Sequence, residues 1–436
     1  RKMSYDRAIY PTTLRRDLQA SLQTLAAAAA QRTGPHLSVA ILAADHTSGE
    51  IIARVGSPGL FAKNRAGAID MTRAIRSPGS TLKPLIYGLG FDRGLIAPET
   101  LIEDRPTRFG SYAPQNFGKD FNGTVTIREA LARSLNIPAV KVLERVGPGH
   151  LIGRMTGAGI ATELPRGLAP NLAIALGGIG MDLHALVRLY AGIARNGDPT
   201  GLCVTACTSR AKSSHGRNTA ARLLSKSASV SIRRILLTAP PPPNARGGRI
   251  AFKTGTSYGH RDAWAVGFDG RHVIGVWVGR PDATASPDLL GRTAAAPVLF
   301  DAFKRVAPRR APFIDAGGSP GTVATSDLPA PLKRFETARW QSLRATYADP
   351  PVAIVFPPDR SVVELTRTRQ AFDPVMFKAE GGVLPLTWLA DGKPISQPMA
   401  THRHVFQPNG DGFVTLTVID ARGRAARSTV RLKTSE

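Results

Sequence analysis

The chain has 436 residues, of which 42% are hydrophobic and 20% charged, and its formal net charge is +25. This composition is typical of a folded protein of two or three domains and excludes a disordered chain. No apolar run reaches the ~18 residues that a membrane-spanning helix needs. The basic residues are scattered, without a stripe interleaved with aromatic residues, so we expect no nucleic-acid partner. An anionic environment near a membrane or wall suits the charge equally well.

Helices and strands follow one another over the first 306 residues in an order that indicates one mixed domain. Leucines spaced as on one helical face predict a helix over 11–33. A long helical and loop region is expected from about 70 to 198, and a closing helix over 293–306. Strands are predicted over 38–45, 51–56, 250–255, 263–269 and 272–280. Strands at both ends and helices between them favour an α/β (α+β) fold, with one central antiparallel sheet and a helical insertion.

The last part of the chain differs from the first 306 residues in composition and in hydrophobic pattern. Residues 307–350 are rich in Pro, Gly, Ser and Arg, which is typical of a linker. From 351 to 436, short alternating strands are separated by turn signals such as "NGDG", which predicts a small all-β, immunoglobulin-like sandwich. We therefore expect a helical lead-in at 1–35, a main domain at 36–306, the linker, and the β domain.

One segment, residues 201–234, shows no clear period and is rich in Ser, Thr and Arg. No Asp or Glu occurs between Asp198 and Asp262. We interpret the segment as sequence that is read partly out of frame, which would leave the following strand poorly supported; the alternative is a basic surface loop. It also holds the two cysteines, Cys203 and Cys207. They have no Cys or His partners at zinc spacing, so we expect neither a metal nor another cofactor.

A serine and a lysine stand three residues apart in "SPGSTLKPLIYG". Pro78-Gly79 ends an extended segment, so Ser80 is expected near a helix N-terminus, where free N–H groups favour developing negative charge. Lys83 lies one turn along the same face. A lysine can take the proton of a serine nucleophile if burial or nearby cations lower its pKa. The alternative is an ordinary helix start with a capping serine and a surface lysine.

A second short motif is "SLN". Thr126 and Glu129 form a capping-box pattern that opens one helix, and Pro138 opens the next. Ser134 and Asn136 are therefore expected at a corner between two helices, where polar groups can project into a cleft. The alternative is a plain turn.

The third motif, "KTGTS", falls in a predicted strand. Lys253 could hold a carboxylate, and Thr254 and Thr256 could hydrogen-bond to it. Gly255 would permit the close approach of a ligand backbone. The alternative is an edge strand guarded by a lysine.

Together the motifs read S-x-x-K, S-x-N and K-T-G, a set typical of penicillin-binding proteins and class A β-lactamases. Over about residues 10–306, the sequence resembles the transpeptidase domain of bifunctional penicillin-binding proteins, through "GTVTIREALARSLNIPAVKVLERVG" and "FKTGTSYGHRDAWAVGFDG" as well as the motifs. The resemblance implies the fold shared by serine transpeptidases and β-lactamases. The tail, about 350–433, resembles the C-terminal domain of one subfamily through "GGVLPLTWLADGKPI", and we expect a binding or positioning module there.

The resemblance also implies a reaction. Ser80 would attack the penultimate D-alanine carbonyl of a peptidoglycan stem peptide, with Lys83 as the base, and expel the terminal D-alanine. An amine of a second stem peptide would then take the acyl group. β-Lactams would acylate the same serine, so stem peptides and β-lactam antibiotics are the expected partners.

The other motif residues acquire roles by the same resemblance. Ser134 and Asn136 would relay a proton and hold the substrate amide. Lys253, Thr254 and Thr256 would bind the substrate carboxylate, with Gly255 between them. The backbone N–H groups of the nucleophile and of Thr256 would form an oxyanion hole.

Related proteins carry an N-terminal membrane anchor and a glycosyltransferase domain ahead of this part, and neither is seen in this sequence. We therefore expect no glycan polymerisation by this chain, and a periplasmic place, associated with the inner membrane only through the anchor of the longer parent. Two alternatives stay open. One is an inactive truncated protein or β-lactam sensor. The other is a serine β-lactamase, but Glu144 and Glu163 are the only glutamates between Asn136 and Lys253, and neither sits in a Glu-x-x-Leu-Asn pattern.

Overall fold

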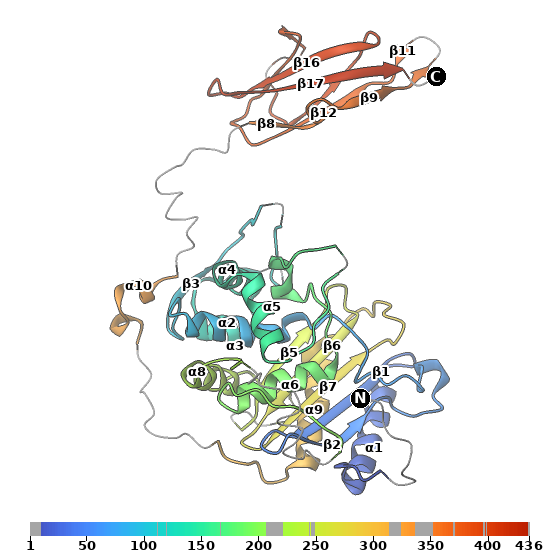
Figure 1. The fold of residues 1–436 in the computed structure, drawn as a ribbon, viewed down its shortest axis with the longest axis vertical. Helices are drawn as coiled ribbons and strands as arrows, with labels where there is room; N and C mark the ends of the chain where they lie inside the picture. Colours follow the sequence, from blue (N-terminus) through green and yellow to red (C-terminus); the bar gives the residue numbers. More distant parts are fainter. Residues whose placement is uncertain are drawn as a thin grey trace. The chain divides into compact units, whose positions relative to one another are not determined.

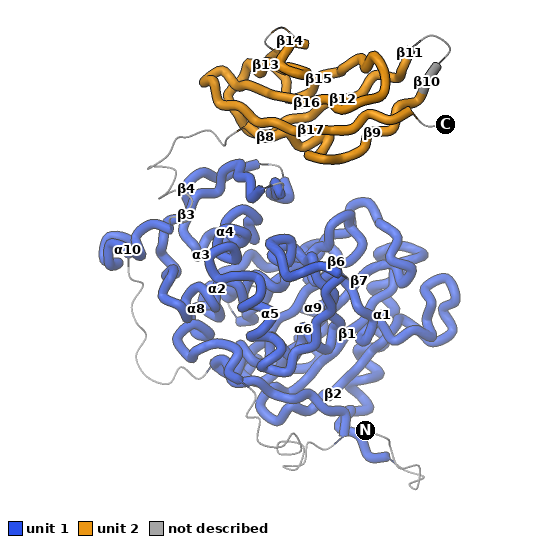
Figure 2. The backbone as a smooth tube through the Cα atoms, turned by 45° about the horizontal axis from the view of Figure 1, so that its top comes forward, with its two compact units in different colours: residues 1–337 blue, residues 338–436 orange. Residues whose placement is uncertain are grey.

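The computed structural model describes residues 10–434 except 111, 119, 166, 206–220, 244, 246–248, 314–323, 336–351, 369–370, 396 and 398. The chain divides into two compact units, residues 1–337 and residues 338–436 (Figure 2).

The first unit contains both helices and strands (Figure 1). In chain order they are α1 (Arg16–Thr33), β1 (Ser38–Asp45), β2 (Glu50–Val55), η1 (Lys63–Arg65), η2 (Gly79–Leu82), α2 (Lys83–Asp92), β3 (Leu101–Asp104), β4 (Gly123–Thr126), α3 (Ile127–Ala132), α4 (Asn136–Val146), α5 (Pro148–Gly157), η3 (Leu172–Leu176), α6 (Leu183–Ala194), α8 (Lys226–Leu237), β5 (Ala251–Thr256), β6 (Asp262–Phe268), β7 (His272–Gly279), η4 (Gly291–Ala295), α9 (Ala296–Val306), η5 (Thr325–Asp327) and α10 (Ala330–Lys333).

A five-stranded sheet in the order β2-β1-β7-β6-β5 is the centre of this unit, and all its neighbouring strands are antiparallel. The strand β1, from the start of the chain, pairs with β7 from far along it, so the prediction of one sheet built from both ends is confirmed. Residues Ala40, Leu42 and Ala44 of β1 enter the larger core, and the alternate residues Val39 and Ile41 enter a second core. Because side chains of a strand alternate between faces, both faces of the sheet are buried.

Helices cover both faces of the sheet. The helices α1 and α9 contribute to the core on one side, and α2, α4, α6 and α8 contribute to the core on the other (Figure 1). The predicted capping box opens α3, since Thr126 accepts from the N–H of Glu129 at 3.1 Å while the Glu129 carboxylate accepts from the N–H of Thr126 at 2.9 Å. None of the helices in the described ranges is long and apolar enough to cross a membrane.

The expectation that segment 201–234 leaves the following strand poorly supported is wrong for its described part after residue 220. Ser225 caps α8, and the helix packs against α2 and β5. The helical period is hidden because two polar residues, Ser229 and Arg233, lie on the buried face. Ser229 donates to the carbonyl of Ser225 at 2.9 Å, and the Arg233 guanidinium lies 5.0 Å from the centre of the Phe313 ring. The strand β5 is therefore supported by α8. The part of the segment at 206–220 lies outside the described residues.

The predicted linker also contains a packed piece. Residues 324–335 include η5 and α10 and belong to the first unit. They pack against the start of β3 and the residue before it. The N–H of Phe335 donates to the carbonyl of Leu101 at 2.7 Å, and the Thr100 hydroxyl donates to the carbonyl of Leu332 at 2.6 Å. Phe335 is itself buried. The composition of this stretch gave no sign of these contacts.

In its described residues, the second unit contains strands and no helix. Its strands are β8 (Ala353–Phe356), β9 (Val362–Leu365), β10 (Arg367–Thr368), β11 (Ala371–Phe372), β12 (Val375–Glu380), β13 (Thr387–Ala390), β14 (Lys393–Pro394), β15 (Arg403–Phe406), β16 (Gly412–Ile419) and β17 (Ala425–Thr434). A three-stranded sheet, β15-β12-β8, and a five-stranded sheet, β14-β13-β16-β17-β9, share one core around Phe377 and Trp388. Strand β9 pairs with β17 in parallel.

We predict that α8 contributes directly to stability. Replacing the fully buried Ile232 with alanine should lower the free energy of unfolding by about 2–4 kcal/mol, because the helix loses buried apolar contacts and leaves a cavity. Urea unfolding followed by circular dichroism measures the change. Lys226→Ala, at an exposed position of the same helix, is the control and should be nearly neutral. Equal stability of Ile232→Ala and wild type would contradict the packing described for α8.

Candidate active site

The three sequence motifs meet between the helical insertion and β5. Ser80 lies in the η2 turn and Lys83 opens α2, Ser134 and Asn136 form the corner between α3 and α4, and Lys253 lies in β5. Hydrogen bonds join the last four of these residues into one chain. The sequence had placed them on different elements up to 170 residues apart, and the packing of α2 against α4 and of η2 against β5 brings them together.

Lys83 is fully buried, so the surface-lysine alternative is wrong. Its Nζ donates to the Asn136 Oδ1 at 2.6 Å and to the Ser134 carbonyl at 2.7 Å, and it lies 3.4 Å from the Ser134 hydroxyl. Burial lowers the pKa of Lys83 well below its ordinary value, and the charge of Lys253 lowers it further, whereas Asp104 acts in the opposite direction. All three acceptors are uncharged, so the site tolerates Lys83 as a neutral amine, the form in which it can take a proton.

Ser134 lies between the two lysines. Its hydroxyl accepts from the Lys253 Nζ at 2.7 Å, and Lys253 also donates to the carbonyl of Thr254 at 2.9 Å. Burial lowers the pKa of Lys253 to about 7. Ser134 has a φ of 61°, in the left-handed region that non-glycine residues adopt only when the surroundings hold them there. This conformation accompanies the corner that points its hydroxyl at both amines.

The turn that carries Ser80 is pressed against β5. A Cβ on Gly79, whose φ is +53°, would lie 2.5 Å from the carbonyl oxygen of Thr256, and a Cβ on Gly255 would lie 2.6 Å from the carbonyl oxygen of Pro78. Glycine at both positions therefore lets the turn and the strand touch. The space beside Gly255 is filled by the turn that carries Ser80, and the approach of a ligand backbone to Gly255 stays a prediction.

Two aromatic side chains that the motifs did not predict hold the turn in place. The Tyr190 hydroxyl donates to the carbonyl of Thr81 at 2.8 Å, and the Trp264 Nε1 donates to the carbonyl of Ser77 at 2.8 Å. Both side chains are fully buried. An aromatic residue in an amphipathic helix or a buried strand looks like ordinary core, so the sequence carried no signal for these contacts.

The two threonines of the third motif are half-buried at the end of β5. The Thr256 hydroxyl accepts from the N–H of Gly291 at 3.1 Å, so its own proton can be donated to another acceptor. Beyond them, the loop after β5 meets the loop after Asn116, since the His260 and Phe117 rings have centroids 5.4 Å apart. Phe117 is 64% exposed, so this ring contact lies at the surface.

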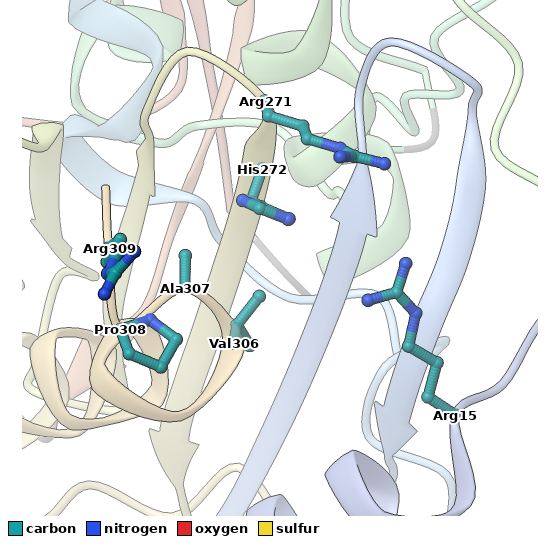
Figure 3. A pocket seen from close by; sticks show the side chains of 7 residues that line it. All are labelled: Arg15, Arg271, His272, Val306, Ala307, Pro308 and Arg309. Atoms are coloured by element: carbon teal, nitrogen blue, oxygen red, sulfur yellow. The ribbon is translucent and has the colours of Figure 1, made fainter. Parts of the chain in front are cut away.

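An open pocket of about 460 Å³ lies apart from this site, and none of the eight predicted site residues lines it. Its lining residues are Arg15, Arg271, His272, Val306, Ala307, Pro308 and Arg309 (Figure 3). Two of its basic groups already have acidic neighbours, because Arg271 lies 2.7 Å from the Asp45 carboxylate and His272 lies 3.4 Å from that of Asp269.

Comparisons with known proteins identify the family of the chain. Residues 39–286 match the family described as the penicillin binding protein transpeptidase domain, which is more than half of the chain. Residues 341–432 match the Penicillin-Binding Protein C-terminus Family. The chain therefore belongs to the transpeptidase-domain family of penicillin-binding proteins, and the resemblance predicted from its motifs is confirmed.

Two individual penicillin-binding proteins show how much of a longer relative this chain matches. The chain is 42% identical over 292 residues to penicillin-binding protein 1C of Escherichia coli (strain K12), which covers 66% of this chain and 37% of that protein. It is 29% identical over 293 residues to penicillin-binding protein 1B of Haemophilus influenzae, which covers 62% of this chain and 36% of that protein. The chain thus spans little more than a third of the length of these relatives.

Solved structures confirm the predicted fold class. The PonA1 protein of Mycobacterium tuberculosis, in complex with penicillin V, matches with a TM-score of 0.60 at 18% identity, over 71% of this chain and 89% of that one. The transpeptidase domain of penicillin-binding protein 3 from Burkholderia pseudomallei matches with a TM-score of 0.53 at 21% identity, over 71% and 98%. At such identities the likeness is one of fold.

The pKa of Lys253 predicts how stability changes with pH. An unfolded lysine titrates near ~10.4, whereas Lys253 in the folded chain titrates at about 7. Between these values the unfolded state holds a proton that the folded state has lost, so the free energy of unfolding should rise with pH, by up to about 1.4 kcal/mol per unit. Lys83 acts in the same direction.

Urea unfolding at pH 7, 8 and 9 tests this expectation. The Lys253→Met variant should show a shallower rise than wild type, because only Lys83 then contributes. Lys226→Met, which removes an exposed lysine, controls for the change in net charge. Parallel curves for wild type and Lys253→Met would show that Lys253 is protonated to the same extent in both states.

Proposed function

We propose that this chain is a peptidoglycan D,D-transpeptidase that works through an acyl-enzyme on Ser80. The observation that carries the proposal is the buried chain of hydrogen bonds from Lys83 through Ser134 to Lys253, beside a serine held in a turn against β5. A serine needs a base that is neutral near the working pH, and burial of Lys83 supplies one.

In the first half-reaction, the Ser80 Oγ attacks the penultimate D-alanine carbonyl and its proton passes to the Lys83 amine. The carbonyl oxygen becomes an oxyanion, which the backbone N–H groups of Ser80 and Thr256 would stabilise; one such donor is worth about 10²–10³ in rate. The close contact of the Ser80 turn with Thr256 supports this role. Ser134, hydrogen-bonded to Lys253 and near Lys83, would carry a proton to the departing D-alanine amine.

In the second half-reaction, an amine of a neighbouring stem peptide attacks the acyl-enzyme, loses its proton through the same groups, and releases Ser80. The result is a cross-link between two stem peptides. Water in place of the amine would give a D,D-carboxypeptidase side reaction. Asn136 would hold the substrate amide, while protonated Lys253, with Thr254 and Thr256, would bind the substrate carboxylate. Such a substrate places the reaction in the periplasm.

β-Lactams present a strained amide and a carboxylate to the same groups, so they should acylate Ser80 and leave slowly. A β-lactamase would need a carboxylate that activates a deacylating water. Glu144 and Glu163, the two glutamates available between the second and third motifs, both have exposed side chains. This exposure supports a long-lived adduct and a transpeptidase over a β-lactamase.

Labelling with a fluorescent penicillin tests the nucleophile. Wild-type protein should form a stable adduct that peptide mapping places on Ser80, and Ser80→Ala should form none, because the hydroxyl that carries the acyl group is gone. Ser48→Ala, at an exposed serine, is the matched control and should label like wild type. An adduct on another residue, or no adduct in folded wild type, would refute the acyl-enzyme.

The acyl transfer itself needs a second assay with a pentapeptide donor and an amine acceptor. A transpeptidase should release one D-alanine for each cross-link formed, with any excess of D-alanine coming from hydrolysis of the acyl-enzyme, whereas a sensor should label with penicillin and form no product. Rapid turnover of the penicillin adduct would indicate a β-lactamase instead.

A further inference from the structure

A buried carboxylate organises the loop next to the site. Asp104, the last residue of β3, is completely buried. Its oxygens accept from the Asn116 Nδ2 at 2.8 and 2.9 Å, from the Asn122 Nδ2 at 2.7 Å and from the N–H of Asn122 at 2.9 Å. In the described part of the chain these partners are amides, and no Lys or Arg forms an ion pair with Asp104. Because a buried charge is costly without several hydrogen bonds, this carboxylate holds the loop around itself.

These bonds fix the orientation of the Asn116 amide. The Nδ2 also donates to the carbonyl of Asp120 at 2.9 Å, so the Oδ1 must point the other way, where it accepts from the N–H of Asn136 at 2.8 Å. Reversing the amide would set two donors against each other at Asn136 and an oxygen against the Asp104 carboxylate. Only one orientation therefore satisfies the neighbours.

The same logic then orients Asn136. Its Nδ2 donates to the carbonyl of Gln115 at 2.6 Å, which turns its Oδ1 toward the Lys83 Nζ at 2.6 Å. Two consecutive loop residues, Gln115 and Asn116, thus hold the side chain and the main chain of Asn136. A continuous set of contacts runs from Asp104 through Asn116 and Asn136 to Lys83.

We propose that Asp104 and Asn116 are positioning residues for acylation: they fix Asn136, and through it the Lys83 amine, in the geometry that the attack by Ser80 needs. Neither residue touches the reacting atoms. The inference rests on the proposed function, since it assumes that Lys83 serves Ser80. A displacement of about 1 Å in such a group can cost up to about 10²-fold in rate.

The test is the acylation of the full chain by a fluorescent penicillin, resolved into non-covalent affinity and the first-order acylation rate constant. Asp104→Asn keeps the shape of the side chain but presents an NH₂ group to the donors of Asn116 and Asn122. We expect its acylation rate constant to fall by about 10- to 100-fold, with little change in affinity. Glu103→Gln is the control: its carboxylate is bound by Arg105 and Thr124 at the surface, so acylation should be unchanged.

A double-mutant cycle separates positioning from a general effect on folding. In an Asn136→Ala background, Asp104→Asn should cause little further loss, because the group that it positions is already absent. An equal loss in both backgrounds would overturn the inference. If Asp104→Asn does not fold, Asn116→Ala tests the same link, since it leaves both hydrogen bonds from Asn122 to Asp104 in place.

The possible failures can be told apart. Absence of an adduct in folded wild type would refute the proposed acyl-enzyme, whatever the variants do. An adduct in wild type together with an unchanged acylation rate constant in folded Asp104→Asn and Asn116→Ala would refute only the positioning role.

Discussion

The structure around the site depends on the burial of two lysine amines beside one serine hydroxyl. Lys83 and Lys253 both approach Ser134, burial lowers the pKa of each, and the charge of Lys253 lowers the pKa of Lys83 further. No carboxylate hydrogen-bonds either amine in the described residues; their acceptors are a side-chain amide, a hydroxyl and two carbonyls. Neutral acceptors satisfy the hydrogen-bonding of an amine without restoring its charge, and this is why one lysine can be a base at a pH where an exposed lysine cannot.

Such a site requires a rigid frame, because two repelling amines would otherwise move apart or draw in water. The sheet supplies the frame, because both its faces are buried and Lys253 lies in one of its strands, β5. The helical insertion supplies the opposite wall through α2 and α4. Contacts at Gly79 and Gly255 leave no space between the Ser80 turn and β5, so the position of Ser80 is set by main-chain contact rather than by side chains alone.

Much of this could be predicted from the sequence, for a physical reason. The short motifs predicted the site, because their spacing indicates a serine close to a lysine; their residues are Ser80, Lys83, Ser134, Asn136 and Lys253. The strands at both ends of the domain could be predicted because they are continuous apolar runs. Asn116 and Tyr190 could not be predicted, since their roles depend on partners 20 and 109 residues away that only the fold brings near. The helix α8 was missed because Ser229 and Arg233 interrupt its apolar face.

The place of β5 in the sheet bears on how the proposed peptide substrate would bind. It is the last strand in the order β2-β1-β7-β6-β5, so within the described chain only one of its edges is paired with another strand of the sheet. An unpaired edge presents N–H and C=O groups at peptide spacing, which an extended peptide can meet with its own main chain. With Gly255 closed by the Ser80 turn, a substrate lying along this edge would reach the nucleophile beside Thr256. The close contact at Gly255 therefore brings Ser80 to the edge of β5 along which the proposed peptide substrate would lie.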